Sequence, residues 1–446
     1  MATKPRWLHD NSVQLLLEIA RMEGIELRFV GGCVRDFVME RDLAYGDIDL
    51  ATPHLPDVIC QAFAKHGRVI PTGIAHGTVT VMLEAGKDDI NQHGNNNRGF
   101  EITTLRRDVQ CDGRHATIEF VDDWEVDALR RDFTMNALFM NDHGEIIDYV
   151  GGVADAIAGR VRFIGDANAR IAEDYLRILR YYRFLATHGK LLQQDDYAYE
   201  AIAKYAHKLV AGGGVSGERI GHEMTKMLGA DNPYAALELM AETKVWQVIT
   251  GQEITGQAVT GDAVINLTAL RDLIDRELID RELIAGELKI GELIAGEGQF
   301  NIKPNFNPWR RLCALISSTN INTQYIANNW RLTNVTKKYM QAMANAHMIK
   351  DIDSLRVQVA QHGKDMVQEM LLLQQDLAGN TTQLLQYLHD YQPQPCPVNG
   401  ALLLQNGFSH GIKIKYALES CNDAWLQSDF SLSMEQLLVI AAEHNV

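Results

Sequence analysis

The sequence has few of the features that mark a disulfide-bonded, disordered or membrane-spanning protein. Its six cysteines are scattered over 446 residues without the Cys-x-x-Cys spacing of zinc and redox sites. Ten prolines and 35 glycines are well below the level of disordered chains, and 46% of the residues are hydrophobic. No secretory signal or apolar run of 18 residues is visible. We therefore expect a folded cytoplasmic protein with reduced cysteines and no membrane segment.

The chain also lacks the basic excess of a protein that is covered with nucleic acid on all sides. Its formal net charge is −16, and the isoelectric point is about 5.4. Local contact with RNA is still possible, because recognition depends on where the positive charge lies. The arginines concentrate between residues 98 and 183. This distribution suits a positive cleft in an otherwise acidic protein.

Two adjacent glycines follow an apolar stretch near the N-terminus. Residues 25–30 have the composition of a buried strand, and residues 33–39 can form a helix. Gly31 and Gly32 lack Cβ, so the amides at the helix start can approach an anion that the helix dipole favours. Arg35 would add a permanent charge suited to phosphate. Taken by themselves, the two glycines are better explained by an ordinary strand–turn–helix corner than by a phosphate site.

A pair of carboxylates separated by one residue strengthens the phosphate interpretation. Asp47 and Asp49 would point to the same face of an extended strand, where they repel each other unless a cation lies between them. Hard oxygen ligands of this kind favour Mg²⁺, which takes phosphate oxygens as further ligands. Glu101, on another strand-like run, is the best third acid. Solvated positions in a turn or on a strand are the alternative for all three.

Five ordered motifs that include these residues resemble the class II tRNA nucleotidyltransferase and bacterial poly(A) polymerase family. They span about half of the chain. Glu40 and Tyr175 depart from the usual pattern, but no charged participant is missing. The motifs occupy residues 29–36 with 46–50, 130–138, 148–155, 173–184 and 216–224.

The resemblance implies a role for individual positions. Gly32 and Arg35 would contact the triphosphate, Asp47 and Asp49 would bind metal, and Arg131 would contact the nucleotide. The remaining implied contacts are to the incoming base and its phosphates, from Asp174, Arg177, Arg180 and Arg183. With Glu101, these residues form the predicted site.

The fourth motif also has a chemical argument of its own. We expect one helix that Asp166 or Asn168 caps and Gly189 ends. Four charged residues recur in it at every third position and form a stripe, namely Asp174, Arg177, Arg180 and Arg183. An arginine-rich surface helix with one ion pair between residues three apart is the alternative.

Cytosine and adenine share a recognition pattern that this helix can match. Both bases show an amino donor beside a ring nitrogen acceptor. A carboxylate next to a guanidinium, such as Asp174 near Arg177, fits that order. Uracil and guanine show the reverse order and would meet mismatched partners. One protein pair could therefore select CTP and ATP without a nucleic-acid template.

The predicted fold class is α+β at the front and all-α behind. The resemblance implies that the front is a polymerase-beta-like nucleotidyltransferase head and that an all-α neck, body and tail follow. Strand signals, including residues 78–83 and 100–105, end before residue 150. We expect four parts: a head at 1–150, a helical neck at 151–215, a body at 216–304 and a tail at 305–446. Two tail segments, 397–403 and 407–411, resemble the part with which bacterial CCA-adding enzymes would grip tRNA; a helix–turn–helix packing corner is the alternative.

Three further segments carry structural predictions. Residues 84–98 are expected to be a polar loop, and residues 106–124 either a mobile loop containing Gly113 and Arg114 or a simple hairpin. Residues 273–297 repeat a five-residue unit that starts as Leu-Ile-Asp-Arg-Glu. A period of five keeps no constant apolar face in a helix or a strand. We expect a surface linker whose deletion leaves catalysis intact.

The sequence therefore predicts a CCA-adding tRNA nucleotidyltransferase that adds CMP, CMP and AMP from CTP and ATP. In such a two-metal reaction one ion activates the RNA 3′-hydroxyl and the other steadies the triphosphate. A poly(A) polymerase, a partial C-adding or A-adding enzyme and a catalytically silent RNA-binding relative remain open as alternatives. The oligomeric state also remains open.

Overall fold

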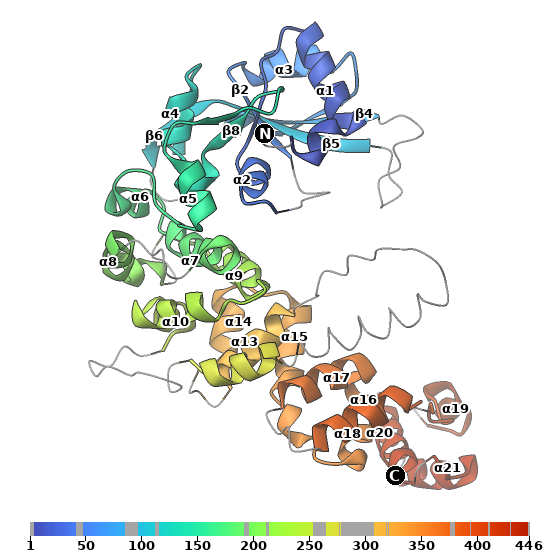
Figure 1. The fold of residues 1–446 in the computed structure, drawn as a ribbon. Coiled ribbons are helices and arrows are strands. Elements are labelled where there is room, and N and C mark those ends of the chain that lie inside the picture. Colours follow the sequence, from blue (N-terminus) through green and yellow to red (C-terminus); the bar gives the residue numbers. More distant parts are fainter. Residues whose placement is uncertain are drawn as a thin grey trace, which may run out of the picture. The chain divides into compact units, whose positions relative to one another are not determined.

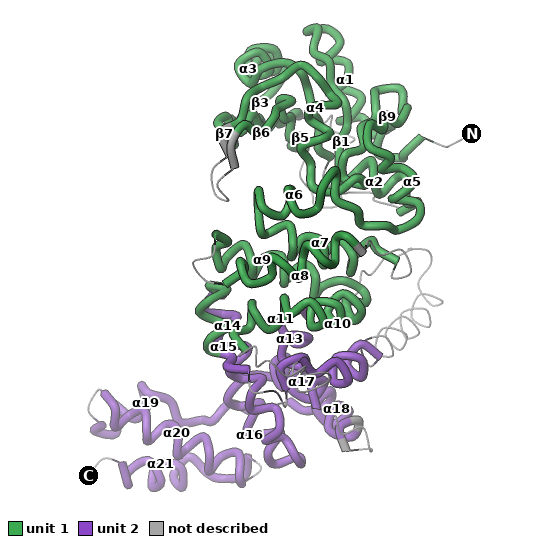
Figure 2. Tube along the Cα trace, turned by 90° about the vertical axis from the view of Figure 1, so that its left-hand side faces the viewer, with its two compact units in different colours: residues 1–260, 324–331 green, residues 261–323, 332–446 purple. Residues whose placement is uncertain are grey.

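The chain folds into two compact units, coloured separately in Figure 2. The first comprises residues 1–260 and 324–331, and the second residues 261–323 and 332–446. The computed structural model describes residues 4–41, 48–84, 97–111, 116–190, 196–210, 214–252, 265–275, 277, 307–317, 319, 321–374, 380–392, 394–408, 411–428 and 430–444.

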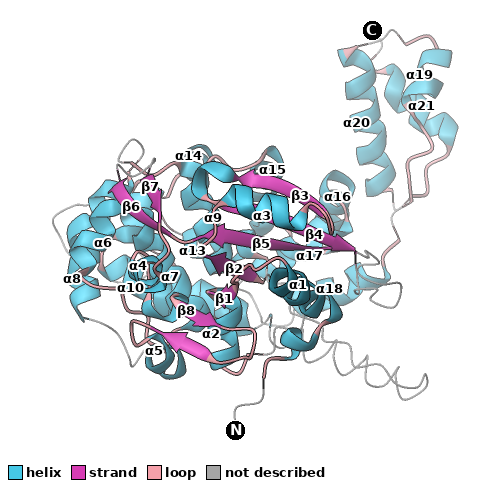
Figure 3. Cartoon of the chain, turned by 90° about the horizontal axis from the view of Figure 1, so that it is seen from above, coloured by secondary structure: helices cyan, strands magenta, loops and turns pink. Residues whose placement is uncertain are grey.

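All described strands belong to the first unit (Figure 1). The strands are β1 (Arg28–Val30), β2 (Asp49–Thr52), β3 (Arg68–Gly73), β4 (Thr78–Glu84), β5 (Asn97–Thr104), β6 (Arg106–Cys111), β7 (Ala116–Phe120), β8 (Leu138–Met140) and β9 (Ile146–Asp148). They form a mixed sheet in the order β3-β4-β5-β2-β1-β8-β9, seen from above in Figure 3, and a separate β6–β7 hairpin. Only β2 and β5 pair in parallel.

Two helices cover one face of the sheet, and part of the other face remains available for chemistry. Helices α1 (Asn11–Met22) and α3 (Pro56–Phe63) lie on the same side and pack against β4 (Figure 1). Side chains that alternate along β4 and β5 are buried on that side, namely Val79, Val81, Phe100 and Ile102. Because side chains alternate along a strand, the residues between them face the opposite side.

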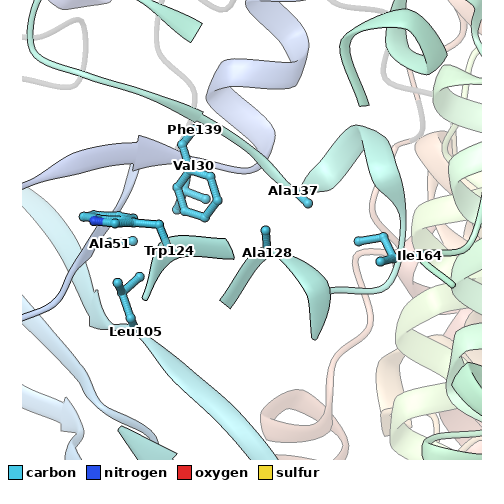
Figure 4. Close-up of a cluster of buried hydrophobic side chains, with 8 residues drawn as sticks. All are labelled: Val30, Ala51, Leu105, Trp124, Ala128, Ala137, Phe139 and Ile164. Atoms are coloured by element: carbon cyan, nitrogen blue, oxygen red, sulfur yellow. The ribbon is translucent and has the colours of Figure 1, made fainter. Parts of the chain in front are cut away.

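A hydrophobic cluster fastens the segment after β5 to the opposite face of the sheet (Figure 4). Trp124 and Ala128 come from α4 (Trp124–Leu129), and the ring of Trp124 meets that of Phe139 edge-on at 5.5 Å between centroids. The cluster comprises Val30, Ala51, Leu105, Trp124, Ala128, Ala137, Phe139 and Ile164. The packing of this cluster positions α4 and therefore Arg130 and Arg131, which follow it.

After Asp148, all regular secondary structure in the described residues is helical, as predicted. In the first unit these are α5 (Gly152–Ala158), α6 (Ala167–Glu173), α7 (Leu176–His188), α8 (Asp196–Tyr205), α9 (Gly217–Leu228), α10 (Tyr234–Glu242) and α11 (Val245–Thr250). Helix α2 (Gly32–Val38) precedes them on the open side of the sheet. Helix α14 (Thr323–Asn329) returns to this unit, where the indole of the buried Trp330 donates a hydrogen bond to the Ile249 carbonyl at 2.9 Å.

The second unit is helical wherever it is described. Residues 267–275 are helical and are followed by α13 (Pro308–Ile316), α15 (Asn334–Met343), α16 (Ile352–His362), α17 (Lys364–Leu373), α18 (Asn380–Asp390), α19 (Gly400–Gln405), α20 (Ile412–Gln427) and α21 (Met434–Ala442). A small core of its own joins the last three helices, around Leu403, Ala417, Cys421 and Leu437.

The interpretation of residues 273–297 as a surface linker is wrong for the first repeat. Leu273 is buried, and the Glu277 carboxylate binds Arg310 at 2.7 Å and the fully buried Arg311 at 2.8 Å. A buried arginine requires a partner, and this one comes from the repeat itself. Residues 278–297 lie outside the described residues.

Most local predictions for the first unit agree with the observed elements. The strands expected at 78–83 and 100–105 are β4 and β5, and residues 106–124 contain the β6–β7 hairpin. Gly113 and Arg114 lie outside the described residues, as does most of the expected polar loop at 84–98. The four-part division of the chain stays a proposal beside the two compact units.

Candidate active site

The glycine pair forms a tight turn between β1 and α2. Gly31 has a φ of +75°, a conformation that favours glycine, and its amide donates to the Leu138 carbonyl at 3.1 Å. Gly32 is the first residue of α2. A Cβ on Gly31 would stand 4.0 Å from Nη1 of Arg131. The helix start and this arginine therefore border the same turn.

Arg35 is buried one turn into α2, and neighbouring side chains orient its guanidinium. Nε and Nη2 bind the two carboxylate oxygens of Asp36 at 2.9 and 3.0 Å. Nη1 donates to the Asn136 side chain at 2.8 Å. Nη2 is also near the glycine turn, 3.8 Å from where a Cβ on Gly32 would lie. Its proposed contact with phosphate stays a prediction.

Asp49 and Glu101 lie side by side on the open face of the sheet. β2 and β5 run parallel, and Asp49 is the register partner of Glu101. Both residues are exposed, while Leu50 and Ile102, which follow them, are buried on the other face. Neighbouring strands are about 4.8 Å apart, so these carboxylates repel each other unless a cation lies between them. Asp47 lies outside the described residues.

The glycine turn reaches the same end of the sheet as this acid pair. Phe29 pairs with Leu50 in the antiparallel β1–β2 ladder, so the register brings Val30 opposite Asp49, with Gly31 directly after it. Cys33 of α2 lies within the field of Asp49: burial, and then the charge of Asp49, raise the pKa of its thiol to about 12. The thiol is therefore protonated at neutral pH and is no nucleophile.

The second motif supplies an arginine and a buried acid. Arg131 donates from Nε and Nη2 to Asp127 at 3.2 and 2.8 Å and lies 5.4 Å from the ring centroid of Phe139. Asp132 is buried and accepts hydrogen bonds from the Phe133 amide and the Asn136 side chain. Burial alone would raise the pKa of Asp132, but Arg180 and the hydrogen bonds from Asn136 and the Phe133 amide together outweigh it and hold the pKa below its ordinary value.

The expected single helix over the fourth motif is two helices. Asp166 caps α6 and Gly189 ends α7, as predicted, but the chain becomes extended at Asp174. The Asp174 carboxylate accepts a hydrogen bond from the Leu176 amide at 3.0 Å, close to the start of α7. The charged residues recur at every third position on both sides of the break. Their spacing therefore did not reveal that the helix is interrupted at Asp174.

Asp174 and Arg177 each bind another residue. Nη2 of Arg219 on α9 donates to Asp174 at 2.7 Å. Nη1 of Arg177 donates to Glu173 at 2.5 Å and to the Arg170 carbonyl at 2.8 Å. In the described part of the chain, Asp174 and Arg177 form no ion pair with each other.

Arg180 and Arg183 connect α7, called the neck helix below, to two buried acids that the predicted site did not include. Arg180 binds Asp132 through Nε at 2.7 Å and through Nη2 at 2.5 Å, and its Nη1 is 3.9 Å from Glu223. Arg183 donates from Nε to Glu223 at 2.6 Å. Asp132 lies in the motif at 130–138 and Glu223 in the motif at 216–224. Asp132 directly follows Arg130 and Arg131, and this was the available sequence signal for it.

The neck helix also contacts α2 directly. Nε2 of His188, the last residue of α7, is 3.2 Å from Asp36, the partner of Arg35. Burial lowers the pKa of His188 to about 4, so the neutral imidazole makes this contact at pH 7. Hydrogen bonds from His188 and Arg35 outweigh burial and keep the pKa of Asp36 below its ordinary value. The glycine turn and α7 are thus linked by buried polar contacts.

Residues of the third motif hold α5 against the second motif. Asp148 accepts hydrogen bonds from the Val150, Gly152 and Val153 amides at the start of α5. A Cβ on Gly152 would lie 2.1 Å from the Thr134 carbonyl oxygen, so only glycine fits there. This close approach places α5 against the segment between Asp132 and Asn136.

Comparison with known families agrees with this arrangement. Residues 27–162 match the family model described as a poly A polymerase head domain, and residues 195–252 match a probable RNA and SrmB-binding site of polymerase A. Over these residues the chain is similar to members of the tRNA nucleotidyltransferase/poly(A) polymerase family. The recognition made from the five motifs is thereby confirmed.

Curated relatives match this chain over about half of its length. The mitochondrial CCA tRNA nucleotidyltransferase 1 of Mus musculus is 40% identical over 244 residues, which cover 53% of this chain and 52% of that protein. A CCA-adding enzyme of Bacillus cytotoxicus is 36% identical over 233 residues, or 52% and 53% of the two chains. The chain thus spans about half the length of the curated relatives it matches.

Solved structures of the family share the fold over nearly the whole chain. The Bacillus stearothermophilus CCA-adding enzyme in complex with CTP has a TM-score of 0.68 at 24% identity and covers 98% of each chain. The Thermotoga maritima CCA-adding enzyme complexed with tRNA has a TM-score of 0.57 at 16% identity, covering 99% and 98%. The predicted α+β fold, with a nucleotidyltransferase head followed by helices, is confirmed.

No helix in the described ranges is long and apolar enough to cross a membrane.

Proposed function

We propose that this protein is a CCA-adding tRNA nucleotidyltransferase, which adds CMP, CMP and AMP to tRNA 3′ ends from CTP and ATP. One observation carries the proposal: Asp49 and Glu101 are register partners on parallel strands, at the sheet end where the glycine turn leads into α2. A triphosphate bound by Gly32 at the helix start would lie beside these acids.

The acids fit a divalent cation. Carboxylate oxygens are the ligands that Mg²⁺ prefers, and two such side chains are exposed at one register of the open face. Asp47, Asp49 and Glu101 would hold the ion. In the predicted two-metal reaction, one Mg²⁺ would lower the pKa of the RNA 3′-hydroxyl and a second would steady the pyrophosphate group. Asp47 and any third ligand stay predictions, because the described residues alone contain no cluster of three metal-binding side chains.

Base selection would fall to the residues between α6 and α7. Asp174 would accept a hydrogen bond from the amino group that cytosine and adenine share, and Arg177 would donate to the ring nitrogen. Arg180 and Arg183 have buried acids as partners, so we propose that they hold the neck helix against the second motif and add positive charge near the triphosphate. The Arg131 contact with nucleotide remains part of the proposal.

The proposed substrates agree with what relatives are named to bind. Solved CCA-adding enzymes of similar fold are in complex with CTP, ATP and tRNA. The assignment of tRNA binding to residues 305–446 rests on resemblance. The cytoplasmic location also stays a prediction, since some relatives are named as mitochondrial.

Incubation of the purified protein with tRNA that lacks its CCA end, and with one nucleotide at a time, tests the proposal. We expect two CMP additions with CTP alone and none with UTP or GTP. Long tails from ATP without use of CTP would instead indicate a poly(A) polymerase, which the name of the matched head domain keeps as the second candidate. Addition of only C or only A would indicate a partial enzyme, and no addition a silent RNA-binding relative.

A further inference from the structure

We propose that Arg219 is a positioning residue that keeps Asp174 available to the incoming base. The inference rests on the proposed function and concerns how the base-selecting pair is held apart. Nη2 of Arg219 donates to Oδ2 of Asp174 at 2.7 Å, while Oδ1 of Asp174 accepts from the Leu176 amide at 3.0 Å. The carboxylate is thus fixed from two sides and remains about a quarter exposed.

Asp174 and Arg177 would neutralise each other without such partners. They are three residues apart at the start of a helix, where opposite charges readily pair. A direct pair between them would turn the acceptor and the donor towards each other and away from the cytosine or adenine edge. In the described structure each has its own counter-ion instead, Arg219 for Asp174 and Glu173 for Arg177.

The two partners approach from different elements, which makes the separation stable. Glu173 is the last residue of α6 and is also bound by Arg170 at 2.9 Å. Arg219 lies in the first turn of α9, a helix that packs along α7 and whose Glu223 binds Arg183 at 2.6 Å. Arg219 therefore holds Asp174 from a neighbouring helix that is itself tied to α7.

The test compares CTP with UTP in the kcat/KM for the first addition to tRNA that lacks CCA. Uracil presents the reverse hydrogen-bonding order, so the ratio of the two values reports on Asp174 and Arg177. We expect Arg219→Gln to lower the CTP/UTP ratio by about tenfold or more, because Asp174 turns to Arg177. Arg219→Lys, which keeps the charge, should give a ratio between those of wild type and Arg219→Gln.

Glu218→Gln is the matched control. Glu218 precedes Arg219 on the same helix and forms a similar exposed ion pair, at 2.6 Å to Arg331, away from Asp174. We expect its CTP/UTP ratio and melting temperature to equal those of the wild type. If Arg219→Gln and Arg219→Lys lowered both kcat/KM values by one common factor, the inference would be wrong. Failure of the wild type to add CMP would instead refute the proposed function.

Discussion

At the scale of single residues, most charged groups of the site are held by other charged groups. Arg35 is bound by Asp36, Arg131 by Asp127 and Arg180 by Asp132. Such pairing limits the conformations of long side chains before substrate arrives. Asp49 and Glu101 differ from them, because two acids at one register have the same sign of charge. The site thus combines preset cations with a carboxylate pair that suits a metal.

Removal of one of these acids should abolish addition and spare RNA binding. We predict that Asp49→Ala lowers the rate of CMP addition by about 10³-fold or more, since a lost metal contact removes several kcal/mol of transition-state stabilisation. Asp47→Ala should do the same. Single-turnover addition and filter binding of tRNA measure the two effects separately.

Asp57→Ala provides the control for these variants. Asp57 is an exposed acid in the first turn of α3, the helix that covers the other face of the sheet. Its substitution should change neither rate nor affinity. Addition that survived Asp49→Ala would remove the metal assignment.

His188 should make folding stability depend on pH between about 6.5 and 4. The unfolded imidazole takes up a proton near its ordinary pKa of 6.5, whereas burial lowers the folded pKa to about 4. Its contribution is therefore complete above pH 6.5 and is lost as the pH falls towards 4, by on the order of 3 kcal/mol. Asp36, Arg35 and Arg41 are the charged groups around it, and the lowered pKa of Asp36 acts at more acidic pH.

Urea unfolding at pH 7 and pH 5 tests this effect. The free energy of unfolding of the wild type should fall more between the two values than that of His188→Gln. His207→Gln, at an exposed position of the same unit, should behave like the wild type. Equal pH slopes for all three proteins would contradict the assignment to His188.

At the scale of elements, the repeat region divides into a structural first unit and a remainder. We predict that deletion of residues 278–297 leaves nucleotide addition unchanged, whereas deletion of 273–297 destabilises the second unit. The larger deletion removes buried Leu273 and leaves Arg310 and Arg311 without the Glu277 carboxylate. Breaking a buried ion pair by removing one partner costs about 3–5 kcal/mol. Glu277→Ala should show a loss of that size in urea unfolding.

Local patterns predicted the elements well, but not the contacts between them. The β-rich composition of residues 78–83 and the glycine at 189 were sufficient to locate β4 and the end of α7. The break at Asp174 and the pairing of Arg219 with Asp174 depend on how α9 packs against α7, which no local pattern records. Glu277 was misassigned because a five-residue period describes the whole repeat and hides the burial of its first unit.

At the scale of the whole molecule, buried polar contacts connect the two ends of the proposed nucleotide site. From Arg35 near the glycine turn they pass through Asn136 to Asp132, then to Arg180 of α7 and Glu223 of α9. Helix α9 also carries Arg219, which binds the proposed base-selecting Asp174. All of these residues belong to one compact unit. The triphosphate end and the base-selecting end therefore have a fixed relation, which a protein that selects nucleotides without a template requires.

The product formed from CTP and ATP together tests this account most directly. Purified protein is incubated with tRNA that lacks its CCA end and both nucleotides, and the new 3′ ends are sequenced. We predict that the chain adds C, C and A in that order and stops, and that EDTA prevents all addition. Long A tails, random mixtures of the two nucleotides or addition that persists in EDTA would contradict it.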